Sequence, residues 1–170
     1  KSASLSLVDH VFTRIGASDN LVEGQSTFMV EMTETAYILN NATQHSLVLL
    51  DEIGRGTSTY DGMSIAGSVL FHLHNQLKSR CLFATHYHEL TQLSAPLSAV
   101  CNMSMAIVED DTGIAFTYEL VKGPADKSYG VHVATMAGLP SSVIGQAKEM
   151  LASFESGDTI CKSVGQLSLF

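Results

Sequence analysis

The chain has 170 residues, of which 45% are hydrophobic and 15% are charged, and its formal net charge is −8. This composition excludes an intrinsically disordered chain, and the length suffices for one domain with a hydrophobic core. The acidic balance argues against a broad nucleic-acid-binding surface, because such surfaces are basic. The three cysteines have no metal-type spacing, and neither a signal peptide nor an apolar run of about 18 residues is present, so we expect a reduced cytosolic protein without a membrane span.

The first predicted elements are a strand and a helix. Val8–Ile15 is typical of a strand at a sheet edge, and a helical pattern begins after Ser26 and Thr27. Either hydroxyl can cap the first turn, and Glu31 and Glu34 favour the early half of the helix. The apolar positions of this helix recur at spacings of three and four: Phe28, Met29, Met32, Ala36, Ile38, Leu39 and Ala42.

A short apolar run, Leu47–Leu50, ends on two adjacent carboxylates, Asp51 and Glu52. The run is too short for a buried helix, and a strand that is apolar on both faces is typical of the centre of a parallel sheet. Such sheets bind ligands at the carboxyl ends of their strands, where the two acids would emerge. Two carboxylates at that edge suit a hydrated Mg²⁺ and a general base, although a turn with solvated acids explains this run equally well by itself.

A second helix and strand follow the acids. Asp61–Gln76 has apolar residues at helical spacing, and Cys81–Thr85 is a short apolar run that ends at His86. A strand, a helix and a second strand of these lengths predict a right-handed parallel βαβ unit. His86 would then project at the same sheet edge as Asp51 and Glu52.

The rest of the chain predicts a hairpin, two helices and a tail. Val100–Val108 and Ile114–Val121 favour an antiparallel hairpin. Ser128–Ala137 and Ser142–Phe154 favour two helices joined by a tight turn, and Ser156–Gly165 favours a polar tether. The second helix carries a single lysine, so helix packing or dimer contact is a better interpretation of this pair than DNA reading.

Four motifs occur in a fixed order along these predicted elements. They are S-T-F-M-V-E-M at Ser26–Met32, L-V-L-L-D-E at Leu47–Glu52, G-R-G-T-S-T-Y-D-G at Gly54–Gly62 and F-A-T-H at Phe83–His86, with further support at Phe12–Asn20 and Lys127–Gly130. Together they resemble the ATPase domain of MutS-type DNA mismatch-repair proteins, and the resemblance covers Val8–Phe154. It implies an α/β fold of the P-loop NTPase class, similar to ABC ATPases, with a mostly parallel sheet flanked by helices. It divides the chain into a partial ATPase domain at 1–125, a helical dimerisation appendage at 126–156 and a flexible tail at 157–170.

The resemblance also implies roles for individual residues. Asp51 would help to hold Mg²⁺, Glu52 would polarise the attacking water, and His86 would sense the γ-phosphate and orient that water. Ser26, at a helix N-terminus, would reach the γ-phosphate of ATP bound on the other subunit, which suits the partial positive charge of such an end. The loop Gly54–Asp61 would couple the two sites across the dimer. Its polar groups at the nucleotide would be Thr57, Ser58 and Asp61.

The function implied is that of the C-terminal part of a DNA mismatch-recognition protein, in which ATP binding and hydrolysis drive conformational switching. Its partners would be a second copy through the ATPase domain, mismatched DNA through domains outside this chain, and a MutL-type protein. The tail Gln166–Phe170 resembles the pentapeptide with which bacterial repair proteins bind the DNA polymerase sliding clamp. Its contacts with the sliding clamp would come from Gln166, Leu167, Leu169 and Phe170, with Leu169 and Phe170 in an apolar pocket and Gln166 at its rim.

One family motif is absent. The 170 residues contain no G-x-x-x-x-G-K-[ST] loop, which in the family cradles the phosphates. We therefore expect the chain to be a fragment or a truncated protein, and we expect no efficient ATP hydrolysis by these residues alone.

Three other interpretations remain open. A metal hydrolase would use His86, His88 and Glu89 with Asp51 as ligands, although a further histidine motif at suitable spacing is missing. A non-catalytic module would supply dimer contacts and a clamp-binding tail. Another ABC-type ATPase of DNA maintenance would share the mechanism but act on a different DNA substrate.

Overall fold

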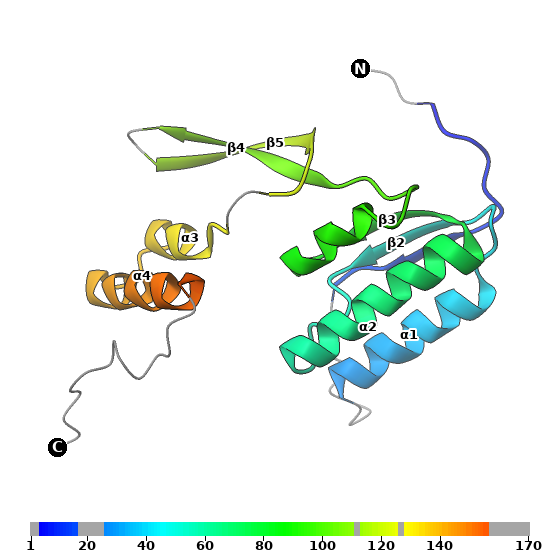
Figure 1. Cartoon of the computed structure of the whole chain (residues 1–170), viewed down its shortest axis with the longest axis horizontal. Coiled ribbons are helices and arrows are strands. Elements are labelled where there is room, and N and C mark those ends of the chain that lie inside the picture. Colours follow the sequence, from blue (N-terminus) through cyan, green and yellow to red (C-terminus); the bar gives the residue numbers. More distant parts are fainter. Residues whose placement is uncertain (1–3, 17–25, 111–112, 126–127, 157–170) are drawn as a thin grey trace. The chain divides into compact units, whose positions relative to one another are not determined.

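The structure is a computed structural model of the chain, and it describes residues 4–16, 26–110, 113–125 and 128–156 (Figure 1). The chain divides into two units. The first comprises Lys1–Ser104 and Lys122–Pro124, and the second comprises Met105–Val121 and Ala125–Phe170. Each unit packs mainly within itself.

A parallel sheet forms the centre of the first unit. Its strands are β1 (Val11–Arg14), β2 (Leu47–Asp51) and β3 (Arg80–Ala84), in the order β1-β2-β3, and β2 pairs in parallel with both neighbours. The predicted central position of the strand that ends at Asp51 is therefore confirmed. The predicted first strand is confirmed at an edge of the described sheet, but it is shorter than the expected range of 8 to 15.

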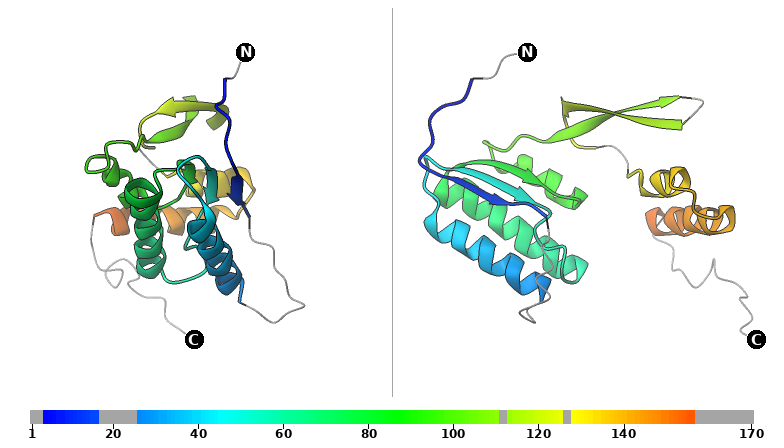
Figure 2. Two further views of the ribbon diagram at one scale, coloured as in Figure 1. Left: turned by 90° about the vertical axis from the view of Figure 1, so that its right-hand side faces the viewer. Right: turned by 180° about the vertical axis from the view of Figure 1, so that it is seen from behind.

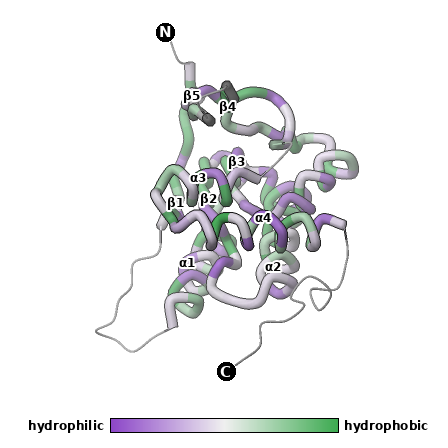
Figure 3. Tube along the Cα trace, turned by 90° about the vertical axis from the view of Figure 1, so that its left-hand side faces the viewer, coloured by the Kyte–Doolittle hydropathy of each residue, from purple (hydrophilic) through white to green (hydrophobic). Residues whose placement is uncertain are grey.

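Two helices, α1 (Thr27–Asn41) and α2 (Thr59–His72), lie side by side on one face of this sheet (Figure 2). Hydrophobic and hydrophilic colours alternate along both helices in Figure 3, as expected for helices with one buried face. The core between helices and sheet is formed by Ile38, Ala42, Val48, Leu50, Ile53, Val69 and Leu73. Burial of each large aliphatic side chain there contributes about 1.5–3 kcal/mol, so this core fixes the direction in which β2 ends.

The helix boundaries correct two expectations. α2 begins two residues before Asp61, and it ends at His72, where a π-helical turn, η1 (Leu73–Leu77), continues the chain. Ser26 occupies the N-cap position of α1, but its side chain makes no capping hydrogen bond. Glu31 does not act through the helix dipole, because it lies beyond the first turn and is buried with partners of its own.

Asp9, just before β1, is hydrogen-bonded to the turn that precedes β2. Its carboxylate accepts hydrogen bonds from the hydroxyls of Thr43 and Ser46, the latter at 2.7 Å, and from the backbone N–H of His10. These bonds, with the Thr43 hydroxyl first, lower the pKa of Asp9 from 3.8 to about 2. The turn before β2 is thereby tied to the chain that enters β1.

After β3, the chain forms a 3₁₀ helix, η2 (His88–Ser94), whose Leu90 packs against Ala66 of α2 and against Tyr87. The strands β4 (Met103–Asp110) and β5 (Gly113–Lys122) then pair with each other. Because the intervening connection is too short for a parallel crossover, the pair is the predicted antiparallel hairpin.

The last described elements are the helices α3 (Gly130–Met136) and α4 (Ser141–Glu155), which pack against each other. α3 ends at Met136, and Gly138, two residues later, has a φ of 83° and donates its N–H to the Thr135 carbonyl at 3.0 Å. The two predicted helices are thus confirmed as a pair. None of the helices in the described part of the chain is long and apolar enough to cross a membrane.

Candidate functional site

The carboxyl ends of β2 and β3 bring Glu52 and His86 together. Asp51, the last residue of β2, lies opposite Ala84, the last residue of β3. The backbone N–H of Glu52 donates to the Ala84 carbonyl at 3.0 Å, so the pairing continues one residue beyond the strand. The Nδ1 atom of His86 lies 3.8 Å from Oε1 of Glu52, at the sheet edge where the sequence places both side chains.

The Glu52 carboxylate lies between His86 and a residue that the sequence analysis gave no role, Arg55. Nη1 of Arg55 donates to Oε2 of Glu52 at 2.7 Å. Because 75% of the Arg55 side chain is exposed, solvent weakens this ion pair and the guanidinium can leave the carboxylate at little cost. The only sequence signal for Arg55 was its place as the single cation in the loop after the acids.

The backbone of Glu52 is unusual for a non-glycine residue. Its φ is 51°, in the left-handed region where a side chain costs about 1–3 kcal/mol and where functional residues are often held. A conformation of this kind persists only where the surrounding structure supports it.

Asp51 precedes Glu52 and is half-buried. Within the described ranges its carboxylate makes no hydrogen bond or ion pair, so the carboxylate oxygens are free for a ligand. One carboxylate is sufficient for Mg²⁺, because this ion usually retains several of its water ligands and binds proteins through one or two carboxylates. In the same part of the chain, no three His, Cys, Asp or Glu side chains are grouped closely enough to hold a metal ion. The metal-hydrolase interpretation therefore has no ligand set among the described residues.

The glycines of the loop allow it to pack closely. A Cβ on Gly54, whose φ is 94°, would lie 2.5 Å from the carbonyl oxygen of Gly62 in α2. A Cβ on Gly56 would lie 2.9 Å from Cβ of Phe28 in the first turn of α1. Since real Cβ atoms do not approach this closely, the loop can lie between the starts of α1 and α2 only with glycine at these positions.

Ser58 and Asp61 are hydrogen-bonded to each other at the start of α2. The Ser58 hydroxyl, at the N-cap of α2, accepts from the Asp61 N–H at 3.4 Å and donates to the Asp61 carboxylate at 2.8 Å. This is a helix cap, which the sequence analysis did not assign to them. Ser26 and Thr57 are also exposed or half-buried, and no hydrogen bond or ion pair among the described residues joins either of them to Glu52 or His86.

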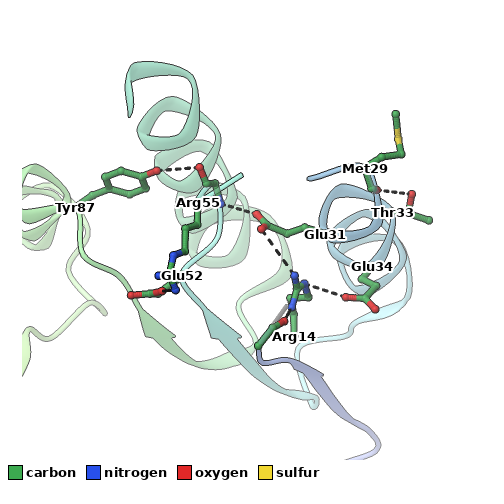
Figure 4. Close-up of polar contacts among 10 residues, drawn as sticks. Arg14, Met29, Glu31, Thr33, Glu34, Glu52, Arg55 and Tyr87 are labelled. Atoms are coloured by element: carbon green, nitrogen blue, oxygen red, sulfur yellow. Dashed lines mark hydrogen bonds and ion pairs between the residues drawn. The ribbon is translucent and has the colours of Figure 1, made fainter. Parts of the chain in front are cut away.

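A buried polar network beside the site was missed by the sequence analysis (Figure 4). Glu31 is 6% exposed, and its Oε1 accepts from the Gly54 N–H at 2.6 Å. Its Oε2 lies 3.8 Å from Nη2 of Arg14, a side chain that is 7% exposed. Nε of Arg14 also lies 2.9 Å from Oε2 of Glu34, although the N–H is not aligned for a hydrogen bond.

Tyr87 completes the network from the other side of the loop. Its hydroxyl donates to the Gly54 carbonyl at 3.0 Å. Burial raises the pKa of Tyr87, and the negative charges of Glu31 and Glu52 raise it further, so the phenol remains a protonated donor. A sequence signal for Glu31 existed, because its spacing from the apolar residues Ile38 and Ala42 places all three on one helical stripe. An acid on such a stripe predicts a buried partner.

The comparisons with known proteins agree on one family. The family model described as MutS domain V matches residues 1–155. Proteins named DNA mismatch repair protein MutS from Rickettsia massiliae (strain Mtu5) and Rickettsia felis (strain ATCC VR-1525 / URRWXCal2) are each 57% identical over 159 residues, which is 94% of this chain. The MutS protein of Rickettsia canadensis (strain McKiel) is 57% identical over 160 residues. The chain spans 18% of the length of these relatives.

Proposed function

Because the chain belongs to the MutS domain V family, we propose that it forms the hydrolytic part of the nucleotide site in a longer DNA mismatch-repair protein. The site would belong to a P-loop NTPase fold of the ABC type, with ATP and Mg²⁺ as cofactors. The observation that carries the proposal is the convergence of Glu52 and His86 at the carboxyl edge of a parallel sheet, beside the free carboxylate of Asp51.

The residues of this edge suit attack of water on a γ-phosphate. Glu52 would accept a hydrogen bond from the water once Arg55 moves aside, and His86, 3.8 Å away, would orient the water and contact the phosphate. Asp51 would hold Mg²⁺ through water, and the ion would supply neutralisation of the phosphate charge. The fixed ends of β2 and β3 keep these groups in place, which is the main requirement in phosphoryl transfer.

The second half of the proposal concerns a dimer of ATPase domains. Ser26 stands at the N-terminus of α1 with a side chain that makes no capping bond, so it is available to a phosphate bound on the other subunit. The loop Gly54–Asp61 would lie near the same nucleotide and couple the two sites. There Thr57 would offer its hydroxyl, whereas Ser58 and Asp61 would act by shaping the start of α2.

ATP turnover by the full-length protein that carries this chain tests the proposal. We expect Mg²⁺-dependent hydrolysis that falls by about a hundredfold or more in Glu52→Gln, with ATP binding retained. Glu89→Gln is the matched control, because Glu89 is exposed on the nearby η2 helix. Hydrolysis that survives Glu52→Gln as it survives Glu89→Gln would contradict the assignment. The isolated 170-residue polypeptide should hydrolyse ATP poorly, since its sequence has no phosphate-cradling loop motif.

Self-association through the α3–α4 pair is a second role that a specific observation favours. Ile144 is the buried residue of this pair, whereas large apolar side chains are exposed on both helices and on the turn between them: Val133, Met136, Leu139, Val143, Met150 and Phe154. Exposed apolar groups in this density favour an interface. We expect Phe154→Ser to weaken self-association in sedimentation at several concentrations, and Leu5→Ser, at another exposed apolar position, to leave it unchanged. A strict monomer would argue against this role.

The remaining partners follow from the family alone. Mismatched DNA would bind through other domains of the longer protein, and a MutL-type protein would be a further partner. The segment Gln166–Phe170, which resembles a clamp-binding motif, lies outside the described residues. Deletion of Gln166–Phe170 should abolish affinity for the polymerase sliding clamp in a pull-down, and unchanged affinity would remove this part of the proposal.

A further inference from the structure

We propose that Glu31 and Tyr87 are positioning residues that hold the Gly54 peptide from opposite sides and thereby fix the Glu52 carboxylate relative to His86. The inference rests on the proposed ATPase function, which it deepens. Neither residue touches the reacting atoms in this assignment. Both act through the backbone that leaves the active-site edge of β2.

Glu31 and Tyr87 form a clamp on the Gly54 backbone, with one hydrogen bond from each of them. The Gly54 N–H donates to Glu31 at 2.6 Å, and the Gly54 carbonyl accepts from the Tyr87 hydroxyl at 3.0 Å. Glu31 is 6% exposed and Tyr87 is 5% exposed, so water cannot readily replace either partner. A peptide group that loses a buried partner is left unsatisfied, which makes each bond costly to break.

The clamp lies where the backbone most needs support. Glu52 and Gly54 both have positive φ, 51° and 94°, and Ile53 between them is fully buried. The left-handed turn at Glu52 is unfavourable for a side chain and persists only if the chain after it is held. The bonds to Gly54 hold that chain two residues beyond Glu52. Release of Gly54 would let Glu52 relax and move its carboxylate away from His86.

The clamp also joins three elements of the site. Glu31 comes from α1, whose N-terminus carries Ser26, and Tyr87 directly follows His86 at the end of β3. The rings of His86 and Tyr87 have centroids 4.2 Å apart. A displacement of His86 would therefore be transmitted through Tyr87 to the loop that begins at Gly54. Arg14 of β1 is the cationic partner of the buried Glu31 carboxylate and helps to hold it in place.

The test is steady-state ATP hydrolysis and thermal unfolding of the full-length protein, with matched variants. Tyr87→Phe removes one hydroxyl and keeps the ring, Glu31→Gln keeps an acceptor for Gly54, and Glu31→Met removes it. Tyr37→Phe is the control, because Tyr37 is 63% exposed on α1. We expect kcat to fall by about tenfold in Tyr87→Phe and Glu31→Met with the KM for ATP nearly unchanged, since misplacement of a catalytic group by about 1 Å lowers the rate without weakening binding. Glu31→Gln should restore most of the rate.

A purely structural role would give a different result. In that case Tyr87→Phe would lower the unfolding temperature and leave the kcat of the folded enzyme at the wild-type value, which overturns the inference. If Glu31→Met fails to fold, Tyr87→Phe decides alone. Hydrogen exchange in the peptide that spans Gly54 should rise in Tyr87→Phe and stay constant in Tyr37→Phe, and equal exchange would also overturn the inference. Wild-type protein without Mg²⁺-dependent turnover would overturn the proposed function and the inference together, whereas an unaffected Tyr87→Phe rate beside an active wild type would overturn the inference alone.

Discussion

The substitution Gly62→Ala tests how closely α2 approaches the loop after Glu52. Gly62 lies in the first turn of α2, where alanine would ordinarily stabilise a helix by about 0.5–1 kcal/mol relative to glycine. Here an added Cβ would lie 2.2 Å from the carbonyl oxygen of Gly54 and 2.3 Å from the hydroxyl oxygen of Tyr87. Both distances are far inside van der Waals contact, so the loop or the helix must move.

Two unfavourable contributions and one favourable one set the size of the effect. Overpacking of this kind costs about 1–3 kcal/mol, and loss of the Tyr87–Gly54 hydrogen bond adds about 1 kcal/mol. After the gain in helix propensity is subtracted, we expect Gly62→Ala to destabilise α2 by about 1–3 kcal/mol. The sign is opposite to that of a normal glycine-to-alanine change within a helix.

Native-state hydrogen exchange, read by mass spectrometry in the peptides of each helix, measures the effect where it arises. Gly145→Ala in α4 is the matched control, because its Cβ would meet nothing within 4 Å. We expect protection of α2 to fall in Gly62→Ala and protection of α4 to rise in Gly145→Ala. A rise in both helices would refute the close approach between Gly62 and Gly54.

Three further predictions concern other parts of the first unit. Burial raises the pKa of Cys81 to about 12, so iodoacetamide at pH 8 should label exposed Cys101 and leave Cys81 unmodified in peptide mapping. The pKa of Asp9 is about 2 in the folded state and 3.8 in the unfolded state, so its stabilising contribution is present above pH 4 and is lost as the pH falls toward 2. In Asp9→Asn, the urea midpoint of unfolding should therefore fall less steeply between pH 4 and pH 2 than in the wild type. Arg14→Met leaves buried Glu31 without its cation and should cost about 3–5 kcal/mol in urea unfolding.

The fold of the first unit was predictable because its signals are local. The run Leu47–Leu50 is bounded by polar residues, and a strand of this length and apolarity has few places in an α/β sheet other than its centre. Once β2 and β3 are parallel neighbours, their ends meet at one edge. The proximity of Glu52 and His86 therefore followed from topology, before any side-chain distance was known.

The polar network was not predictable to the same degree, because its partners are distant in sequence. Glu31 bonds a backbone N–H that lies 23 residues later, and Tyr87 bonds a carbonyl that lies 33 residues earlier. A sequence pattern shows that Glu31 falls on the buried stripe of its helix, but it does not show which donor meets it. The cap formed by Ser58 and Asp61 was predictable, because a serine three residues before an acid is a capping pattern. It was overlooked because both residues were assigned to the nucleotide.

The stretch from Asp51 to Gly62 combines a rigid strand, a strained turn and a close-packed loop. The strand and Ile53 are fixed by the core, and the Glu52 N–H bonds the Ala84 carbonyl, but the positive φ at Glu52 remains unfavourable for a residue with a side chain. Further support for this turn comes from the bonds to Gly54 and from the contact of Gly54 with Gly62. In the proposed ATPase, substitutions at Gly54 or Gly62 should therefore lower ATP turnover without altering any side chain assigned to the nucleotide, because they act on the conformation that orients Glu52.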